Sequence, residues 1–130
     1  MATGVVRGRV VLVVDNDANG RGLIETLLLR AGYQVLTASD AASAQGCMRR
    51  QPVDLVIMEL ALPDMDGLAF LSRVKCNPAT RALPVLIVSA YSDTWLKARC
   101  AALGAAGFLS KPFRGRDLVA AVGRILDGAQ

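Results

Sequence analysis

Residues 54–67 read DLVIMELALPDMDG, and this stretch decides the fold. After Asp54 comes an unbroken run of apolar residues, 55–58, followed by a second acid, Glu59, and then by a turn that contains Pro63 and Gly67. A short continuous apolar run bounded by turn residues is typical of a strand that is buried on both faces of a parallel sheet. Glu59 is therefore expected at the end of a buried strand, where such sheets carry their functional groups.

The same alternation of apolar runs and amphipathic segments extends along the whole chain. We expect strands at residues 10–14, 35–38, 55–58, 85–88 and 108–109. Apolar stripes at helical spacing predict helices over residues 23–31, 41–50, 68–76, 94–103 and 117–126. The expected fold is α/β: a flavodoxin-like, doubly wound sandwich around a five-stranded parallel sheet of order 2-1-3-4-5. We expect one domain over residues 1–130, with a core at about 10–126.

The composition excludes several classes of protein. Hydrophobic residues make up 53% of the 130-residue chain and charged residues 20%, which excludes intrinsic disorder. The apolar runs are much shorter than the ~20 residues that span a bilayer. The run after Arg7 and Arg9 is also too short for a signal peptide. We therefore expect a cytoplasmic domain with no membrane partner.

Charge and cysteine usage narrow the chemistry further. The 15 basic residues outnumber the 11 acidic ones, but they are scattered, and aromatic residues make up only 5% of the chain. Direct nucleic-acid binding is therefore not expected. The chain has no histidine, and Cys47, Cys76 and Cys100 form no paired motif, so zinc sites and Cys–His or Ser–His catalysis are unsupported. The thiols are interpreted as structural groups in a reducing compartment.

Polar residues follow four of the five predicted strands. The residues directly after these strands are Asp15, Asn16 and Asp17, then Glu59, then Ser89, and finally Ser110 and Lys111. Because the carboxyl ends of parallel strands meet at one edge, acids, a hydroxyl and a lysine are expected to gather there. Such a set suits a divalent cation, a phosphoryl group and a charged clamp. Helix capping explains Asn16 or Asp17 alone, but it does not explain the whole set.

Four sequence blocks carry a resemblance to a known family. VVLVVDND at residues 10–17, DLVIMELALPDMDG at 54–67, LPVLIVSA at 83–90 and GFLSKPF at 107–113 resemble, in this order, blocks of response-regulator receiver domains. Such domains act in two-component, or phosphorelay, signal transduction and have the chemotaxis-type fold. The resemblance covers residues 10–126. It implies that a histidine kinase transfers a phosphoryl group, with Mg²⁺ present, to an aspartate at the end of the third strand.

The resemblance implies a metal and acceptor site with two departures from the family pattern. Asp15 and Asn16 correspond to the acid pair that holds the metal, and Glu59 to the phosphoacceptor aspartate. Ala61 corresponds to the residue whose backbone carbonyl binds the metal. Glutamate extends the carboxylate by roughly 1.5 Å, a shift that costs on the order of 100-fold in an in-line transfer. Asn16 removes a negative charge, so we expect Mg²⁺ binding to be weak or absent and no ordinary aspartate-type phosphorylation.

The resemblance also assigns switch and clamp residues. Ser89 corresponds to the switch hydroxyl, Phe108 to the switch aromatic and Lys111 to the phosphate-binding lysine, while the bond before Pro112 matches one that is commonly cis in the family. Because Glu59 reaches farther than aspartate, we predict that its carboxylate contacts Lys111 and approaches the Ser89 hydroxyl. This contact would imitate part of the phosphorylated state, and we predict a switch that is biased toward the active-like state without being fixed there.

Three functions remain as hypotheses. The first is a signalling module, not an enzyme, that acts by protein–protein contact independently of phosphorylation. The second is a conventional receiver in which Glu59 still accepts a phosphoryl group from a histidine kinase. The third is a small metal-dependent phosphotransfer enzyme on the same fold. Asp64 and Asp66 lie in the turn after the third strand and are not expected to replace the acceptor.

The expected partners are proteins: a histidine kinase or a downstream effector, with a homodimer left open. The contact surface is predicted at Trp95, Arg99, Arg114 and Arg116. Exposed tryptophan and arginine are the residue types enriched in binding hot spots. The alternative for Trp95 is that its ring packs against its own helix.

Overall fold

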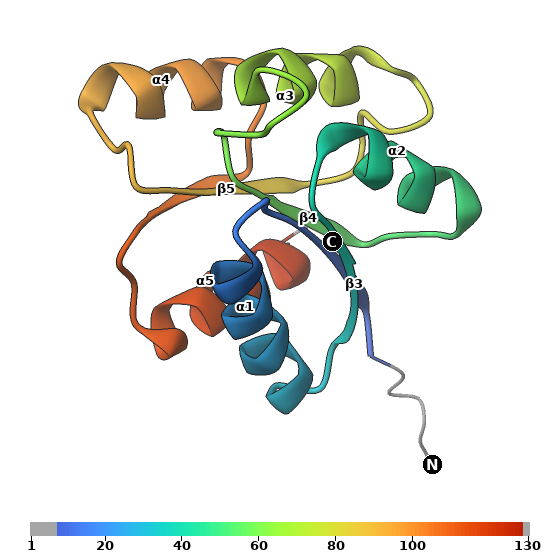
Figure 1. Ribbon diagram of the computed structural model, residues 1–130, viewed down its shortest axis with the longest axis vertical. Coiled ribbons are helices and arrows are strands. Elements are labelled where there is room, and N and C mark those ends of the chain that lie inside the picture. Colours follow the sequence, from blue (N-terminus) through green and yellow to red (C-terminus); the bar gives the residue numbers. More distant parts are fainter. Residues whose placement is uncertain (1–7, 129–130) are drawn as a thin grey trace.

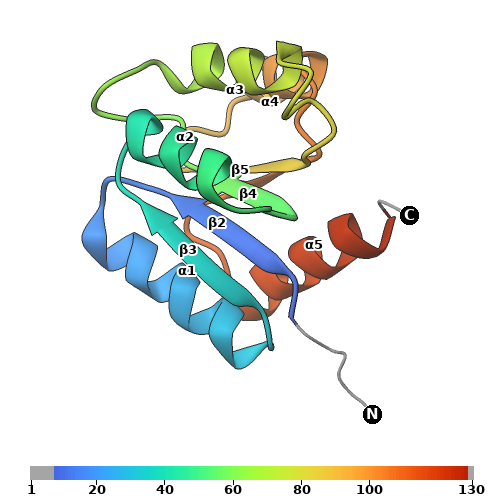
Figure 2. The same ribbon diagram turned by 90° about the vertical axis from the view of Figure 1, so that its right-hand side faces the viewer.

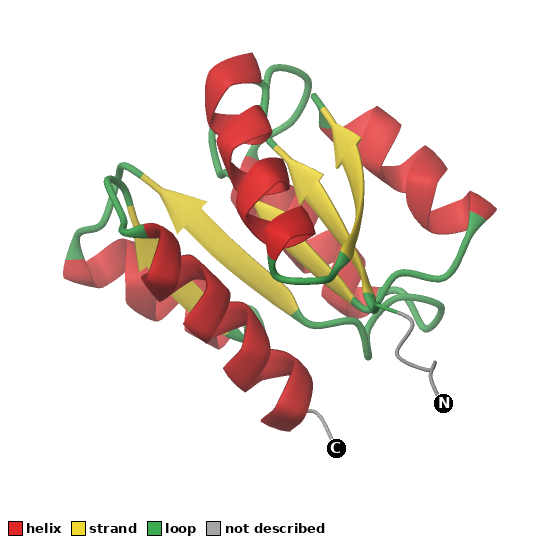
Figure 3. Ribbon diagram, turned by 90° about the horizontal axis from the view of Figure 1, so that it is seen from below, coloured by secondary structure: helices red, strands yellow, loops and turns green. Residues whose placement is uncertain are grey.

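The computed structural model describes residues 8–128. Within these residues, five parallel strands form one sheet in the order β3-β2-β4-β5-β6. The strands are β2 (Val10–Val14), β3 (Gln34–Ala38), β4 (Leu55–Met58), β5 (Val85–Ser89) and β6 (Gly107–Ser110). Figure 3 shows their arrows running in the same direction. In chain order this sheet is the predicted 2-1-3-4-5 arrangement, which confirms the expected flavodoxin-like fold.

Within the described residues 8–128, five helices connect and follow the strands. They are α1 (Ala18–Arg30), α2 (Ala41–Arg50), α3 (Gly67–Cys76), α4 (Thr94–Ala102) and α5 (Gly115–Gly128). Helices α1 and α5 cover one face of the sheet, and α2, α3 and α4 cover the other (Figures 1 and 2). Over the residues that the structure describes, no helix is both long enough and apolar enough to cross a membrane.

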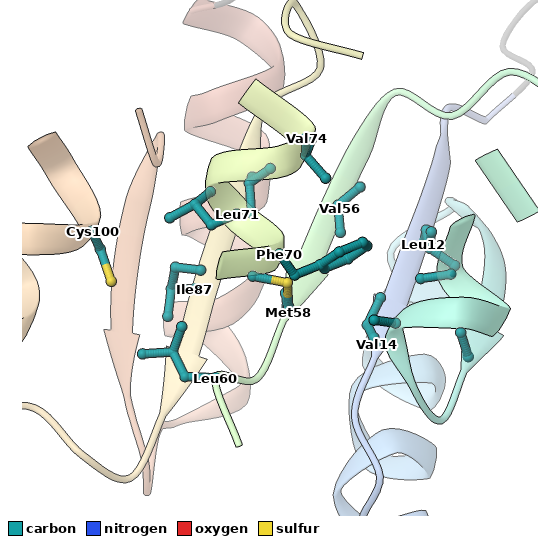
Figure 4. Packing of buried hydrophobic residues seen from close by; sticks show 14 residues of the cluster. Leu12, Val14, Val56, Met58, Leu60, Phe70, Leu71, Val74, Ile87 and Cys100 are labelled. Atoms are coloured by element: carbon teal, nitrogen blue, oxygen red, sulfur yellow. The ribbon is translucent and has the colours of Figure 1, made fainter. Parts of the chain in front are cut away.

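The core consists of two apolar layers, one on each side of the sheet, because successive residues of a strand point to opposite faces. Leu12 and Val14 of β2 face the α2–α3–α4 layer, where the ring of Phe70 lies among side chains of β2 and β4 (Figure 4). Val11 and Val13 face the opposite layer, formed with α1 and α5. All residues of β4 are buried, so the run that opens residues 54–67 is the centre of the sheet, as its composition predicts.

The helix ends follow from local side-chain chemistry. Asp17, Asp40 and Asp93 precede α1, α2 and α4, and each carboxylate accepts a hydrogen bond from a backbone amide in the first turn. Gly32 and Gly104 follow the C-cap residues of α1 and α4 and have φ of 99° and 102°, a conformation that glycine adopts without a Cβ clash. Helix α1 begins at Ala18, earlier than the predicted residue 23. The apolar stripe did not reveal this first part of the helix, because residues 18–22 carry no large apolar side chain.

Candidate functional site

Four polar residues meet at the carboxyl edge of the sheet. Asp15 follows β2, Glu59 follows β4, Ser89 ends β5 and Lys111 follows β6. Within residues 8–128, Asp15, Glu59 and Ser89 are the only polar or charged residues that are buried. Burial of two carboxylates is costly unless each is paired, so their partners determine the chemistry of this edge.

Lys111 supplies a cation that both carboxylates share. Its Nζ lies 3.1 Å from Asp15 Oδ2 and 3.0 Å from Glu59 Oε1. The side chains of Asp15 and Glu59 are only 4% and 10% exposed, whereas that of Lys111 is 24% exposed. The predicted contact between Glu59 and Lys111 is therefore confirmed, and it includes Asp15 as a second acid.

Backbone amides bind the remaining carboxylate oxygens. Glu59 Oε2 accepts hydrogen bonds from the amide of Leu60 at 2.8 Å and from that of Ala61 at 3.4 Å. Asp15 Oδ1 accepts one from the amide of Asp17 at 2.9 Å. Each oxygen of the two carboxylates thus has a hydrogen-bond donor from the chain itself. We call Asp15, Glu59 and Lys111 the carboxylate–lysine triad.

The triad keeps Lys111 charged. Burial alone would lower the pKa of Lys111, but the hydrogen bonds from its ammonium to Glu59 and Asp15, together with their negative charges, outweigh that effect. The net result is a pKa of Lys111 above its ordinary value of 10.5. The ammonium therefore remains a permanent counter-charge at neutral pH.

Ser89 is adjacent in the fold but bonds elsewhere. Its side chain is buried, and its Oγ accepts a hydrogen bond from the backbone amide of Tyr91 at 3.1 Å. The hydrogen bonds described for residues 8–128 include none between Glu59 and Ser89. The physical reason is that Glu59 Oε2 turns back to the amides of Leu60 and Ala61, while Oε1 is held by Lys111.

The proposed metal ligands do not fit a magnesium ion in this arrangement. Mg²⁺ requires oxygen ligands in near-octahedral geometry. Here the Lys111 ammonium lies against both Asp15 and Glu59, and Asn16 is exposed and uncharged. The described residues contain no group of three or more His, Cys, Asp or Glu that could hold a metal ion. The roles assigned to these residues, including the carbonyl of Ala61, remain predictions.

A second acid of the stretch 54–67 has a structural task that the sequence does not reveal. Asp64 accepts hydrogen bonds from the amides of Ala41 at 2.9 Å and Ala42 at 3.0 Å, which begin α2. These two amides lower the pKa of the Asp64 carboxyl. Asp66, in contrast, precedes α3 without a side-chain capping hydrogen bond. The partner amides are distant along the chain, so no local sequence signal identifies this cap.

The predicted contact surface is exposed. Trp95 is 68% exposed, and the neighbouring Tyr91 is 66% exposed, so most of both side chains is open to a partner, and the contact surface stays a prediction. Three arginines of the same prediction are also exposed: Arg99, Arg114 and Arg116.

The two predicted switch residues are Ser89, which is buried at the end of β5, and Phe108 in β6. Phe108 is half-buried against the layer that contains α4, and the Nζ of Lys97 lies 5.7 Å from the centroid of its ring. The bond between Lys111 and Pro112 is cis, which agrees with the resemblance.

The family model and the curated relatives that match this chain point to the same protein family. The model of the response regulator receiver domain matches residues 11–123. The "Probable chemotaxis protein CheY" of Rhizobium etli is 37% identical over 113 residues, which cover 86% of this chain and 88% of that protein. The "Transcriptional regulatory protein GltR" of Pseudomonas aeruginosa is 34% identical over 123 residues, which cover 95% of this chain but 51% of GltR. The chain thus spans about half the length of GltR.

Solved structures agree in fold. The chemotaxis response regulator CheY4 of Vibrio cholerae superimposes with a TM-score of 0.85 at 29% identity, covering 91% of this chain and 98% of CheY4. The receiver domain of NtrX from Brucella abortus gives a TM-score of 0.84 at 30% identity, covering 90% of this chain and 98% of that domain. The match of family, relatives and fold over nearly the same residues places this chain in the response regulator receiver domain family of two-component signal transduction.

Proposed function

We propose that this receiver domain signals through protein–protein contacts without being phosphorylated, and that it has no enzymatic activity of its own. One observation carries the proposal: the Lys111 ammonium is shared by Asp15 and Glu59, and backbone amides bind the other carboxylate oxygens. The site is therefore already supplied with the charges and hydrogen bonds that a phosphoryl group and a metal would otherwise bring.

The geometry of Glu59 disfavours phosphoryl transfer. A phosphoacceptor must present one carboxylate oxygen in line with the leaving group. Here Oε1 accepts a hydrogen bond from Lys111, and Oε2 accepts hydrogen bonds from the amides of Leu60 and Ala61, so the chain itself fixes the direction in which the carboxylate points. The longer side chain adds a shift of roughly 1.5 Å, which by itself costs on the order of 100-fold in rate.

The same contacts imitate half of a phosphorylated site. The resemblance to receiver domains implies that two residues hold a phosphorylated acceptor. They are the lysine after the fifth strand and the hydroxyl residue at the end of the fourth strand. Glu59 makes the lysine contact at 3.0 Å, while the Ser89 hydroxyl bonds the amide of Tyr91. One carboxylate also carries less charge than a phosphoryl group, which has about −2. We therefore expect an equilibrium shifted toward the active-like state but not fixed there.

The lysine also replaces the metal as the resident cation in this proposal. Two carboxylates brought together need a positive charge nearby, and Lys111 provides it from within the chain. Asn16, which is exposed and neutral, adds no charge that would favour a divalent ion. We expect Mg²⁺ binding to be weak or absent in the unmodified protein.

The partner in this proposal is a protein with an acidic contact surface, either a histidine kinase or a downstream effector. Trp95 and Tyr91 offer large exposed aromatic side chains, and the exposed Arg99, Arg114 and Arg116 add positive charge.

Cys47, Cys76 and Cys100 are all free thiols, which supports a cytoplasmic location because thiols stay reduced there.

The test is a phosphodonor assay on the purified chain. Wild type and Glu59→Gln are incubated with acetyl phosphate and Mg²⁺ and analysed by intact-mass spectrometry and Phos-tag electrophoresis. We expect no phosphorylated species in either. The variant Glu59→Asp combined with Asn16→Asp restores the family residues and should become phosphorylated on residue 59. Phosphorylation of wild type that disappears in Glu59→Gln would show a conventional receiver and overturn the proposal.

A further inference from the structure

A second concave site lies at the opposite edge of the sheet from the carboxylate–lysine triad. A hollow of about 350 Å³ opens between the C-terminal turns of α2 and α3 and the loop that leads into β5. Both helices lie on the same face of the sheet (Figure 1). We call it the α2–α3 hollow; the lining residues that matter below are Met48, Arg49, Arg73, Val74, Ala79 and Thr80. It shares no lining residue with the triad, so its role is independent of the function proposed above.

The cations of this hollow are unpaired in the part of the chain that the structure describes. Arg49 and Arg73 are both exposed, and the lining contains no acidic residue. The ion pairs found within residues 8–128 are those of Lys111 alone. No described side-chain hydrogen bond involves either guanidinium.

Two neighbouring cations, Lys75 and Arg50, are engaged, in contrast to Arg49 and Arg73. Lys75 donates to the carbonyl oxygen of Leu83 at 2.9 Å, and Arg50 lies 3.8 Å from the Sγ of Cys47. Arg49 and Arg73 therefore differ from Lys75 and Arg50 in that neither guanidinium has a partner among the described residues, and both border the same hollow.

Helix-end electrostatics account for only part of this arrangement. A cation in the last turn complements the negative end of a helix, and α1 and α4 each carry one arginine there, Arg30 and Arg99. That effect requires no common cavity. In the α2–α3 hollow, two guanidiniums border one concave surface that also includes the side chains of Met48 and Val74. Val74 is 5% exposed, so the hollow combines a buried apolar group with exposed cations at its rim.

The charge distribution of the fold directs anions to this edge. Three helices begin at the carboxyl edge with aspartate caps, whereas α1, α2, α3 and α4 end at the other edge with basic residues. The carboxyl edge is thus the acidic end of the molecule and the edge with the hollow is the basic end. Clefts lined by one sign of charge concentrate ligands of the opposite sign.

We propose that the α2–α3 hollow binds a small organic anion, that is, a carboxylate or phosphate attached to an apolar body. Guanidinium groups bind carboxylate and phosphate oxygens through paired hydrogen bonds, which fits the anionic end to Arg49 and Arg73. Met48 and Val74 contact the apolar body. The volume of the hollow lies within the range of small-molecule sites, about 300–1,000 Å³.

The first test compares four probes on the full chain by two-dimensional NMR titration. Phenyl phosphate and benzoate carry both features, inorganic phosphate lacks the apolar body, and benzyl alcohol lacks the charge. We expect at least one aromatic anion to shift the amides of Met48, Arg49, Val74 and Ala79 and to bind about 10-fold more tightly than the two incomplete probes. A preference between phenyl phosphate and benzoate identifies the anionic group. Equal affinity for inorganic phosphate, or shifts confined to other residues, would overturn the proposal.

The second test uses variants matched in charge. Arg49→Gln and Arg73→Gln are each expected to weaken the tighter aromatic anion about 10-fold, whereas Arg30→Gln removes a helix-end arginine outside the hollow and should leave affinity unchanged. Ala79→Trp fills the hollow but keeps both guanidiniums, and it should also abolish the shifts. Circular dichroism confirms that each variant is folded. Equal weakening by Arg30→Gln, or full binding by Ala79→Trp, would show non-specific attraction and refute the site.

Discussion

The two edges of the sheet use charge in opposite ways. At the carboxyl edge, Asp15 and Glu59 are buried and share Lys111, so the charges are paired within the chain. At the other edge, Arg49 and Arg73 are exposed beside a hollow and have no described partner. Buried charges must be paired to be tolerated, whereas exposed charges can remain available for a ligand. At the carboxyl edge, where receivers are phosphorylated, the charges of the triad are therefore paired within the chain. At the opposite edge, two arginine side chains remain available to bind a ligand.

The largest effect is expected when the cation shared by Asp15 and Glu59 is removed. Lys111→Met leaves two buried carboxylates without a counter-charge and should lower the free energy of unfolding by about 2–3 kcal/mol, a value reduced from that of a fully buried pair because Lys111 is 24% exposed. Arg49→Gln at the open edge should change it by less than about 0.5 kcal/mol. Urea unfolding at pH 7 measures both.

A double variant measures how strongly the two carboxylates depend on the same cation. Lys111→Met combined with Glu59→Gln removes one carboxylate as well as the cation, so part of the lost stability should return. If the loss of unfolding free energy in the double variant equals the sum of the losses in the two single variants, Glu59 and Lys111 do not interact.

Mg²⁺ binding is expected to increase when Lys111 is removed. We expect the wild-type midpoint of thermal unfolding to be nearly independent of Mg²⁺, because Lys111 already neutralises Asp15 and Glu59. In Lys111→Met, Mg²⁺ should raise the midpoint, since a ligand that binds only the folded state stabilises it. Asn16→Asp should strengthen binding in both backgrounds. Tight Mg²⁺ binding by wild type, seen by calorimetric titration, would contradict the interpretation of Lys111 as the resident cation.

The pH dependence of stability offers a smaller test. The folded-state pKa of Lys111 lies above its ordinary value of 10.5, so the stability that the triad contributes is present below that value. It should be lost as the pH rises through the folded-state pKa. The stability difference between wild type and Lys111→Met should therefore shrink above about pH 10.5, as measured by urea unfolding across alkaline buffers. A constant difference would assign the effect of Lys111 to packing.

The smallest effect is expected at Asp64, which caps α2 from a distant loop. Asp64→Ala removes both hydrogen bonds to Ala41 and Ala42, so hydrogen exchange of these two amides should become faster. Asp66→Ala in the same loop, which makes no capping bond, is the matched control and should leave them unchanged. Because the pKa of Asp64 is lowered in the fold, protection in wild type should decline only as the pH falls through that lowered value.

Much of the fold and the composition of the site were predictable from the sequence. The apolar run of β4 and its four counterparts predict buried parallel strands, and parallel pairing brings their carboxyl ends to one edge. This is why the sequence alone assigns Asp15, Glu59, Ser89 and Lys111 to one site. The added length of Glu59 was also enough to predict its contact with Lys111.

Only the tertiary structure decided how the individual atoms pair. Whether Glu59 Oε2 meets Ser89 or its own backbone depends on a side-chain torsion, and the periodicity of the sequence does not encode that torsion. Asp64 reaches α2 because the loop after β4 passes the start of that helix, a contact between segments far apart in the chain. The α2–α3 hollow likewise exists only where two helix ends and a loop meet. Strand periodicity is local and survives in the sequence, whereas side-chain pairing and concavity arise from elements brought together by packing.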